Sequence, residues 1–181
     1  MSKDPLGLKK FIRTVDNFPI DGIAFIDITS LIETPEAFVK TFDELTKITR
    51  NFGADIVASI ESRGFIFAGT IARDLNLPFV LARKPGKLPN ETYKKSFDLE
   101  YGSTSIEIQK NTEIKNNQKI VIVDDLVATG GTAIACSEIF TENFNVKSEN
   151  ILILSIIDLP ELGGSKLISE KGYLIETLID Y

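Results

Sequence analysis

The stretch from Lys119 to Thr132, KIVIVDDLVATGGT, constrains the fold of this chain more than any other. It begins with an uninterrupted run of branched aliphatic residues, Ile120 to Val123, which is typical of a strand buried on both faces. The run stops at Asp124 and Asp125 and opens into a loop that carries no charge. Such a strand belongs to an α/β sheet, in which ligands bind beyond the carboxyl ends of the strands.

Strand-like and helix-like segments alternate along the rest of the chain. The clearest helix begins at Thr34-Pro35-Glu36, and its apolar residues recur every three or four positions up to Phe52. Further helices are predicted over residues 65–76 and about 130–144 and near Lys166, and strands over 54–60, 77–83, 120–125, 150–159 and 173–180. This alternation predicts a mostly parallel central sheet that is flanked by helices and joined by right-handed crossovers.

Residues 83–96 interrupt the alternation with a sequence rich in lysine, proline and glycine, and we expect a long mobile loop there. SFDLEYG and STSIEIQK follow, and they predict a hairpin with its turn at Gly102-Ser103. The loop Glu61-Ser62-Arg63-Gly64 comes directly after the predicted strand 54–60. We expect this loop and residues 124–132 to meet at the carboxyl edge of the sheet.

The composition limits what kind of protein this can be. With 181 residues and 43% hydrophobic content, the chain suits one domain spanning residues 1–181. A formal charge of −6 argues against a broad nucleic-acid surface, and no apolar run approaches the ~20 residues that cross a bilayer, so we expect a cytoplasmic protein without either partner. The absence of histidine excludes histidine triads, bases and metal ligands, and leaves acid–base chemistry to carboxylates, lysine or tyrosine.

The loop from Ala128 to Thr132, ATGGT, suits a phosphate group. Its small residues let backbone N–H groups surround an anion, its threonine hydroxyls add donors, and the following helix directs its positive end at the same place. Asp124 and Asp125 come just before, and their acceptor-only carboxylates suit two neighbouring sugar hydroxyls. The combination predicts a ribose 5-phosphate site. The alternative is that the aspartates merely end a strand and Thr129 caps a helix.

IVIVDDLVATGGT resembles the phosphoribosyl pyrophosphate (PRPP) signature of the type I phosphoribosyltransferases. IESRGFIF, ARKPGKLPNET, DLEYG and DLPELGG are similar to segments of the adenine phosphoribosyltransferase family, in that family's order and spacing over nearly the whole chain. The resemblance implies the type I fold, with a small hood formed by the N- and C-terminal segments and a mobile loop or hairpin. It also implies transfer of 5-phosphoribosyl from PRPP to adenine in purine salvage, giving AMP and pyrophosphate with Mg²⁺ present.

The resemblance further implies roles for single residues. Arg63 would meet the pyrophosphate, Asp124 and Asp125 would bind the ribose and lie near Mg²⁺, mostly through the substrate, and Glu100 would carry a proton at the purine. The implied PRPP-binding set is Arg63, Arg83, Lys84, Lys87, Asp124, Asp125, Ala128, Thr129, Gly130, Gly131 and Thr132, and the implied catalytic set is Glu100, Arg63 and Lys87. The alternatives are an ion pair between Arg63 and Glu61 and a solvated charge run over residues 83–87.

The base pocket is where the chain departs from the family. The resemblance assigns the base to Ala24, Phe25, Ile26 and Leu159, but Ile26 stands where the family usually carries arginine. Transfer to hypoxanthine, guanine or xanthine therefore stays open. A PRPP-binding regulator without turnover is a separate alternative. Tyr93 and Tyr101 would either cover the closed site or pack elsewhere. The family also implies a homodimer in which part of the cationic loop reaches the neighbouring subunit.

Overall fold

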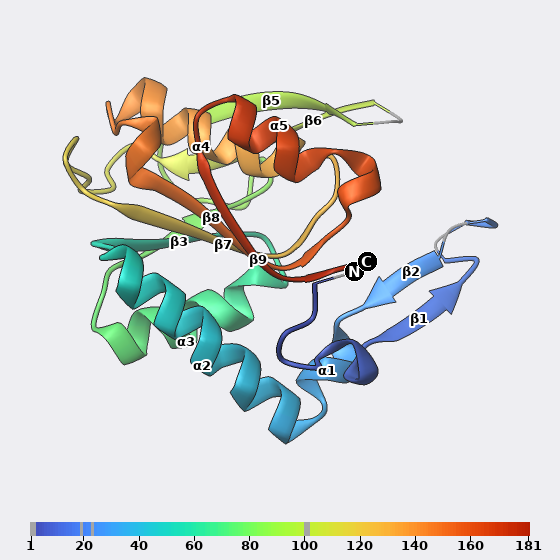
Figure 1. Cartoon of the computed structure of the whole chain (residues 1–181). Coiled ribbons are helices and arrows are strands. Elements are labelled where there is room, and N and C mark those ends of the chain that lie inside the picture. Colours follow the sequence, from blue (N-terminus) through green and yellow to red (C-terminus); the bar gives the residue numbers. More distant parts are fainter. Residues whose placement is uncertain (1–2, 19, 23, 100–101) are drawn as a thin grey trace.

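The computed structural model describes residues 3–18, 20–22, 24–99 and 102–181. Its central sheet has five parallel strands in the order β4-β3-β7-β8-β9, which confirms the predicted mostly parallel sheet (Figure 1). The strands are β3 (Ile56–Ile60), β4 (Phe79–Ala82), β7 (Ile120–Val127), β8 (Ile151–Asp158) and β9 (Leu174–Asp180). Because β3 and β7 are neighbours, the loops that follow them begin side by side.

Helices cover both faces of this sheet. Figure 1 shows α2 (Pro35–Phe52) and α3 (Gly64–Leu75) on one face, and α4 (Gly131–Asn143) and α5 (Gly164–Glu170) on the other. Pro35 stands at the first position of α2, and Gly53 ends that helix in the left-handed conformation that glycine adopts at little cost. The predicted helices are therefore confirmed to within a residue or two at their ends.

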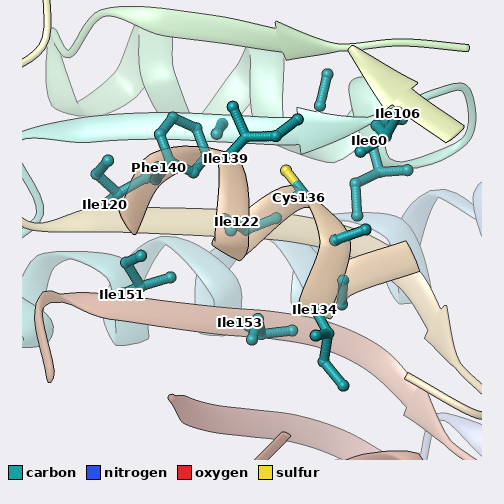
Figure 2. Close-up of a cluster of buried hydrophobic side chains, with 14 of the residues drawn as sticks. Ile60, Ile106, Ile120, Ile122, Ile134, Cys136, Ile139, Phe140, Ile151 and Ile153 are labelled. Carbon is teal, nitrogen blue, oxygen red and sulfur yellow. The ribbon is translucent and has the colours of Figure 1, made fainter. Parts of the chain in front are cut away.

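The face under α4 is packed with branched aliphatic side chains. In Figure 2, Cys136, Ile139 and Phe140 of α4 lie against isoleucines of β7 and β8, and all are buried. The labelled isoleucines are Ile60, Ile106, Ile120, Ile122, Ile134, Ile139, Ile151 and Ile153. Isoleucine side chains are β-branched and lose little further rotational freedom in strands, so these isoleucines favour a rigid sheet under α4.

Two antiparallel hairpins lie outside the central sheet. The first pairs β1 (Arg13–Asp16) with β2 (Ala24–Asp27), and the short α1 (Thr29–Ile32) follows it. The second pairs β5 (Thr92–Leu99) with β6 (Gly102–Gln109) and packs over α4 (Figure 1). Short 3₁₀ turns at Lys9–Phe11, Ser148–Asn150 and Pro160–Leu162 complete the fold.

The hood expected from the resemblance has its counterpart in the terminal segments. The Asp180 N–H donates to the Lys3 carbonyl oxygen at 3.0 Å, so the two ends of the chain lie together beside β9 (Figure 1). The β1–β2 hairpin projects from the same side of the molecule. Within the described residues, no helix is both long and apolar enough to cross a membrane.

The second hairpin corrects two predictions. The loop expected over residues 83–96 ends earlier, because β5 already begins at Thr92. The turn expected at Gly102-Ser103 is wrong, since Gly102 pairs with Leu99 and Ser103 with Asp98 inside the ladder. The hairpin is also tied to the main sheet, because Arg83 and Glu107 exchange backbone hydrogen bonds of 2.9 and 2.7 Å.

Candidate active site

Two adjoining cavities open where β3 and β7 end. The larger, of about 390 Å³, is lined by the loop after β3, by Asp124 and Asp125, by Lys84 and by the inner side of the β5–β6 hairpin. The smaller, of about 160 Å³, is lined by Asp124 and by the backbone of the loop that leads into α4. The predicted meeting of the two loops at the carboxyl edge is thus confirmed, and the two cavities share Asp124, Leu126 and Thr132.

A cavity of about 700 Å³ lies elsewhere, between α2, β9 and the N-terminal segment. Its lining mixes apolar side chains with Lys3, Lys47, Glu44 and Glu176. The described residues that line it include neither a glycine-rich loop nor the positive end of a long helix. Size alone does not identify a catalytic site, because an active site also needs convergent polar groups. We therefore place the candidate active site at the carboxyl edge of the sheet.

The loop from Ala128 to Thr132 has the geometry of an anion cradle. Gly130 has φ +80°, and α4 begins at the next residue, so the first N–H groups of a long helix face the smaller cavity. A helix start of this kind carries about half a positive charge. The five loop residues predicted for the phosphate therefore line one cavity together.

This loop is braced by a residue that the sequence reasoning missed. The Gly164 N–H donates to the Ala128 carbonyl oxygen at 3.1 Å. A side chain on Gly130 would lie 2.9 Å from the Gly164 oxygen, so the two glycine backbones touch. The Gly163-Gly164 pair in the DLPELGG segment was the signal, because adjacent glycines mark a close backbone approach.

Asp124 and Asp125 lie in the second half of β7, which continues to Val127, past the predicted end of the strand at residue 125. The Asp125 N–H donates to Oδ1 of Asp124 at 2.9 Å, and Asp125 is only 6% exposed. Burial raises the pKa of Asp124 well above its ordinary value, and the charge of Asp125 raises that pKa further. Burial also raises the pKa of Asp125, although the nearby Arg63 opposes this shift. Two such carboxylates stay close together only with a cation or hydrogen-bond donors beside them.

Arg63 supplies that cation in the structure. Its Nε lies 2.7 Å from Oδ2 of Asp125, and its guanidinium stands over the Phe25 ring at 5.6 Å from the centroid. Arg63 is held close to β7 because a side chain on Gly64 would lie only 2.7 Å from the Val123 oxygen, so only glycine lets α3 start here. Ser59 completes this contact by donating to the same Val123 oxygen at 2.7 Å.

The ion pair considered between Arg63 and Glu61 is wrong, because Glu61 is bound to Arg83. The two side chains join through Nη2–Oε1 at 3.0 Å and Nε–Oε2 at 3.3 Å, and the Lys84 N–H donates to the same carboxylate at 3.0 Å. The hydrogen bonds from Arg83 lower the pKa of Glu61. The Glu61–Ser62 peptide bond in this loop is cis. Glu61 therefore fixes the start of the cationic loop, a role that sequence reasoning did not assign.

The cationic residues are only partly gathered at the cavity. Lys84 lines it beside the aspartates, whereas the described part of the cavity wall does not include Arg83 or Lys87. Lys87 is exposed, and its carbonyl oxygen accepts from Nη1 of Arg83 at 3.1 Å. Glu100 and Tyr101 lie outside the described residues. Tyr93 packs on Phe144 with ring centroids 5.3 Å apart, so it belongs to the core under the hairpin.

The residues predicted for the base pocket lie on two neighbouring segments. Ile26 of β2 and Leu159, just after β8, pack against the same buried cluster, and Ala24 is exposed. Phe25 points to the other side of β2 and meets Arg63. Phe18, which the sequence reasoning missed, contacts Phe25 edge to face at 5.0 Å between centroids and is 51% exposed. No local pattern in the sequence signals this contact, because Phe18 and Phe25 are seven residues apart and meet only through the β1–β2 hairpin.

Comparison with known proteins identifies the family. Residues 31–171 match the family model described as a phosphoribosyl transferase domain. The chain is 40% identical to the adenine phosphoribosyltransferase of Pelagibacter ubique over 97% of its own length and 98% of that protein, and 42% identical to that of Agathobacter rectalis over 96% and 97%.

Solved structures give the same result. The chain superposes on adenine phosphoribosyltransferase of Thermoanaerobacter pseudethanolicus with a TM-score of 0.87 and 38% identity, covering 97% and 98% of the two chains. It superposes on the Giardia lamblia enzyme, which was solved with 9-deazaadenine, with a TM-score of 0.86 and 34% identity, covering 96% of each chain. Both the predicted family and the predicted type I fold are confirmed.

Proposed function

The chain belongs to the adenine phosphoribosyltransferase family, and we propose that it transfers the 5-phosphoribosyl group of PRPP to adenine, releasing AMP and pyrophosphate. One arrangement carries the proposal. A neutral phosphate cradle, the half-buried Asp124 beside the buried Asp125, and an arginine converge on two adjoining cavities. These groups match the 5-phosphate, the ribose hydroxyls and the pyrophosphate of a single substrate.

Each part of that arrangement has a task in ribosyl transfer. The loop from Ala128 to Thr132 holds the 5-phosphate through N–H groups and threonine hydroxyls. Asp124 and Asp125 accept the ribose hydroxyls, and their charge stabilises a sugar ring that becomes cationic as pyrophosphate departs. Arg63 stabilises the departing pyrophosphate through its planar fork of donors. Arg83, Lys84 and Lys87 support it from the loop.

The carboxylate pair also fits Mg²⁺ that arrives with the substrate. The described residues contain no group of three or more acidic, histidine or cysteine side chains that could form a protein cage. Mg²⁺ is commonly held by one or two carboxylates together with substrate phosphates, and Asp124 and Asp125 meet that requirement. When bound, the metal would neutralise charge on the pyrophosphate.

The proposed base site binds the purine through backbone groups of Ala24 and Ile26, with Phe25 and Leu159 as apolar walls. Adenine has no charge, so apolar walls with backbone donors and acceptors suffice to bind it, and the replacement of the usual arginine by Ile26 is then tolerated. An absorbance assay with PRPP and Mg²⁺ against adenine, hypoxanthine, guanine and xanthine tests this. AMP formation with adenine alone supports the proposal. Turnover only with another base refutes the base assignment. If protein that binds PRPP shows no turnover with any of the four bases, the PRPP-binding regulator is favoured.

Two variants test the residue roles. The double variant Asp124→Asn, Asp125→Asn should lose turnover. It should still show a cooperative melting curve, which indicates a folded protein. Near-normal turnover would remove both from the mechanism. Glu100→Gln should lower kcat far more than it raises KM if Glu100 carries the proton at the purine. An unchanged kcat would leave Glu100 with no chemical role.

We also propose that the protein works as a homodimer. Phe65 and Phe79 contact each other at 6.0 Å between centroids, and the neighbouring Ile66 and Leu81 are 42% and 37% exposed. This apolar surface on α3 and β4 adjoins the cationic loop, so a second copy placed there would bring its own loop nearby. Sedimentation should show a dimer that Ile66→Glu dissociates and Leu167→Glu on α5 does not. A monomeric wild-type protein would refute the proposal.

A further inference from the structure

Arg63 connects the proposed ribose site with the proposed base site. Its Nε lies 2.7 Å from Oδ2 of Asp125, and its Cζ lies 5.6 Å from the centroid of the Phe25 ring. Asp125 is a proposed acceptor for ribose hydroxyls, and Phe25 is a proposed wall against which the purine stacks. A single guanidinium therefore occupies two places that the substrates need.

Among the residues that the structure describes, Arg63 has few other acidic neighbours. Glu61, the nearest acid in sequence, is already bound by two nitrogens of Arg83 and by the Lys84 N–H. Asp125 is 6% exposed, and a buried carboxylate that loses its cation is strongly disfavoured. Unless another anion binds, Arg63 should therefore remain on Asp125 and over Phe25.

A bound pyrophosphate group changes this balance. It offers several charged oxygens to the guanidinium, and an arginine binds such a group through two parallel hydrogen bonds. Arg63 is 43% exposed, so its side chain has room to rotate while its backbone stays at the start of α3. Rotation toward pyrophosphate would free both the carboxylate of Asp125 and the face of Phe25.

We propose that Arg63 is a positioning residue that couples the two substrates. Without pyrophosphate or PRPP it closes the purine site by covering Phe25, and the anion opens that site by drawing the guanidinium away. This inference rests on the proposed function and adds to it a reciprocal coupling between anion and purine. Such couplings between sites are typically about 5- to 150-fold in affinity.

Calorimetric titration of adenine, with and without saturating Mg²⁺-pyrophosphate, tests the proposal. Wild-type protein should bind adenine at least about 5-fold more tightly with pyrophosphate present. Arg63→Gln should bind adenine without pyrophosphate as tightly as the wild type binds it with pyrophosphate, and its coupling should vanish. Asp125→Asn, which removes the carboxylate that holds Arg63, should also gain affinity for adenine alone.

A matched control variant lies on α3, the helix that begins directly after Arg63. Arg73→Gln removes only an exposed pair with Asp74, so it should keep wild-type coupling. A merely structural role of Arg63 would weaken adenine binding in Arg63→Gln, whereas the proposal demands a gain. Equal adenine affinity in Arg63→Gln and wild type without pyrophosphate, or equal coupling in both, would overturn it. The titration uses whichever purine supports turnover. If that purine is not adenine, only the ligand in the titration changes, and the coupling through Arg63 is still tested.

Discussion

The contact between Gly130 and Gly164 provides the sharpest test of how the phosphate loop is held. A methyl group on Gly164 would overlap the Ala128 oxygen and would lie 2.7 Å from the Gly130 nitrogen and 2.8 Å from the Thr129 carbonyl carbon. All three are backbone atoms, so no side chain can rotate away. Either the phosphate loop or the start of α5 has to move in Gly164→Ala.

The cost follows from the geometry. Overpacking of a close contact destabilises a protein by about 1–3 kcal/mol. For a chain of this size each kcal/mol lowers the melting temperature by about 2–4 °C, so we expect a fall of roughly 2–12 °C. A displaced loop should also lower kcat/KM for PRPP, by roughly a hundredfold if the shift reaches ~1 Å. The KM for adenine should change much less.

Gly69→Ala is the matched control. Gly69 lies inside α3, and a methyl group there would meet only Phe79 Cε1, at an ordinary 3.8 Å. Alanine is favoured over glycine in helices by ~1 kcal/mol, so this variant should melt at or above the wild-type temperature with unchanged kinetics. The two melting curves and the PRPP kinetics decide the matter. If Gly164→Ala behaves like Gly69→Ala, the contact with α5 does not hold the phosphate loop.

Three further tests address the framework. Hydrogen bonds from Thr29 and Arg13 lower the pKa of Asp27 to about 2, so ionised Asp27 stabilises the fold at neutral pH and this stabilisation is lost as the pH falls toward 2. Asp27→Asn should melt below the wild type at pH 7, and the gap should close in melts at acidic pH. Lys95→Met breaks partly exposed ion pairs with two glutamates of α4, so urea unfolding should show a loss below ~1 kcal/mol that shrinks in high salt. Burial raises the pKa of Cys136, so a thiol reagent should label it only on opening, and PRPP should slow the labelling.

The parts that could be predicted from sequence are those that local pattern controls. Ile120 to Val123 form an unbroken apolar run, and they are indeed a strand buried on both faces. Asp124, Asp125 and the loop to Thr132 follow it directly, so their place at the carboxyl edge follows from the parallel sheet. Pro35 and Gly53 mark the ends of α2 through their own backbone preferences.

The hairpin shows where local pattern misleads. Lys94 and Lys95 suggested a solvated loop, but β5 runs through both of them. Lys95 is stabilised there by Glu138 and Glu142 of α4, at 3.0 and 2.6 Å, and the residues adjacent to Lys95 in sequence give no sign of these partners. Gly102 suggested a turn, but it pairs with Leu99 across the two strands, so Gly102 belongs to the ladder.

The pairs that shape the site could not be predicted, because they join residues far apart in the chain. Arg63 with Asp125, Arg83 with Glu61, and Gly130 with Gly164 each arise only when different strands end at the same edge. Arg63 pairs with Asp125 and not with Glu61, the partner considered from sequence. Glu61 looked suitable because it is close to Arg63 in sequence. The sequence does not show that Arg83 and the Lys84 N–H already bind its carboxylate.

The two arginine pairs also explain how an acidic protein can receive a polyanion. With a net charge of −6, the chain repels PRPP at long range, and attraction depends on the few cations at the cavity. In the structure Arg63 and Arg83 are both neutralised by buried or half-buried carboxylates, so the site itself carries little unbalanced positive charge. Glu61 receives three hydrogen bonds, whereas Asp125 receives its cation from one exposed side chain. Arg63 is therefore the arginine that a phosphate can detach at lower cost, and Arg83 is the one that keeps the loop in place.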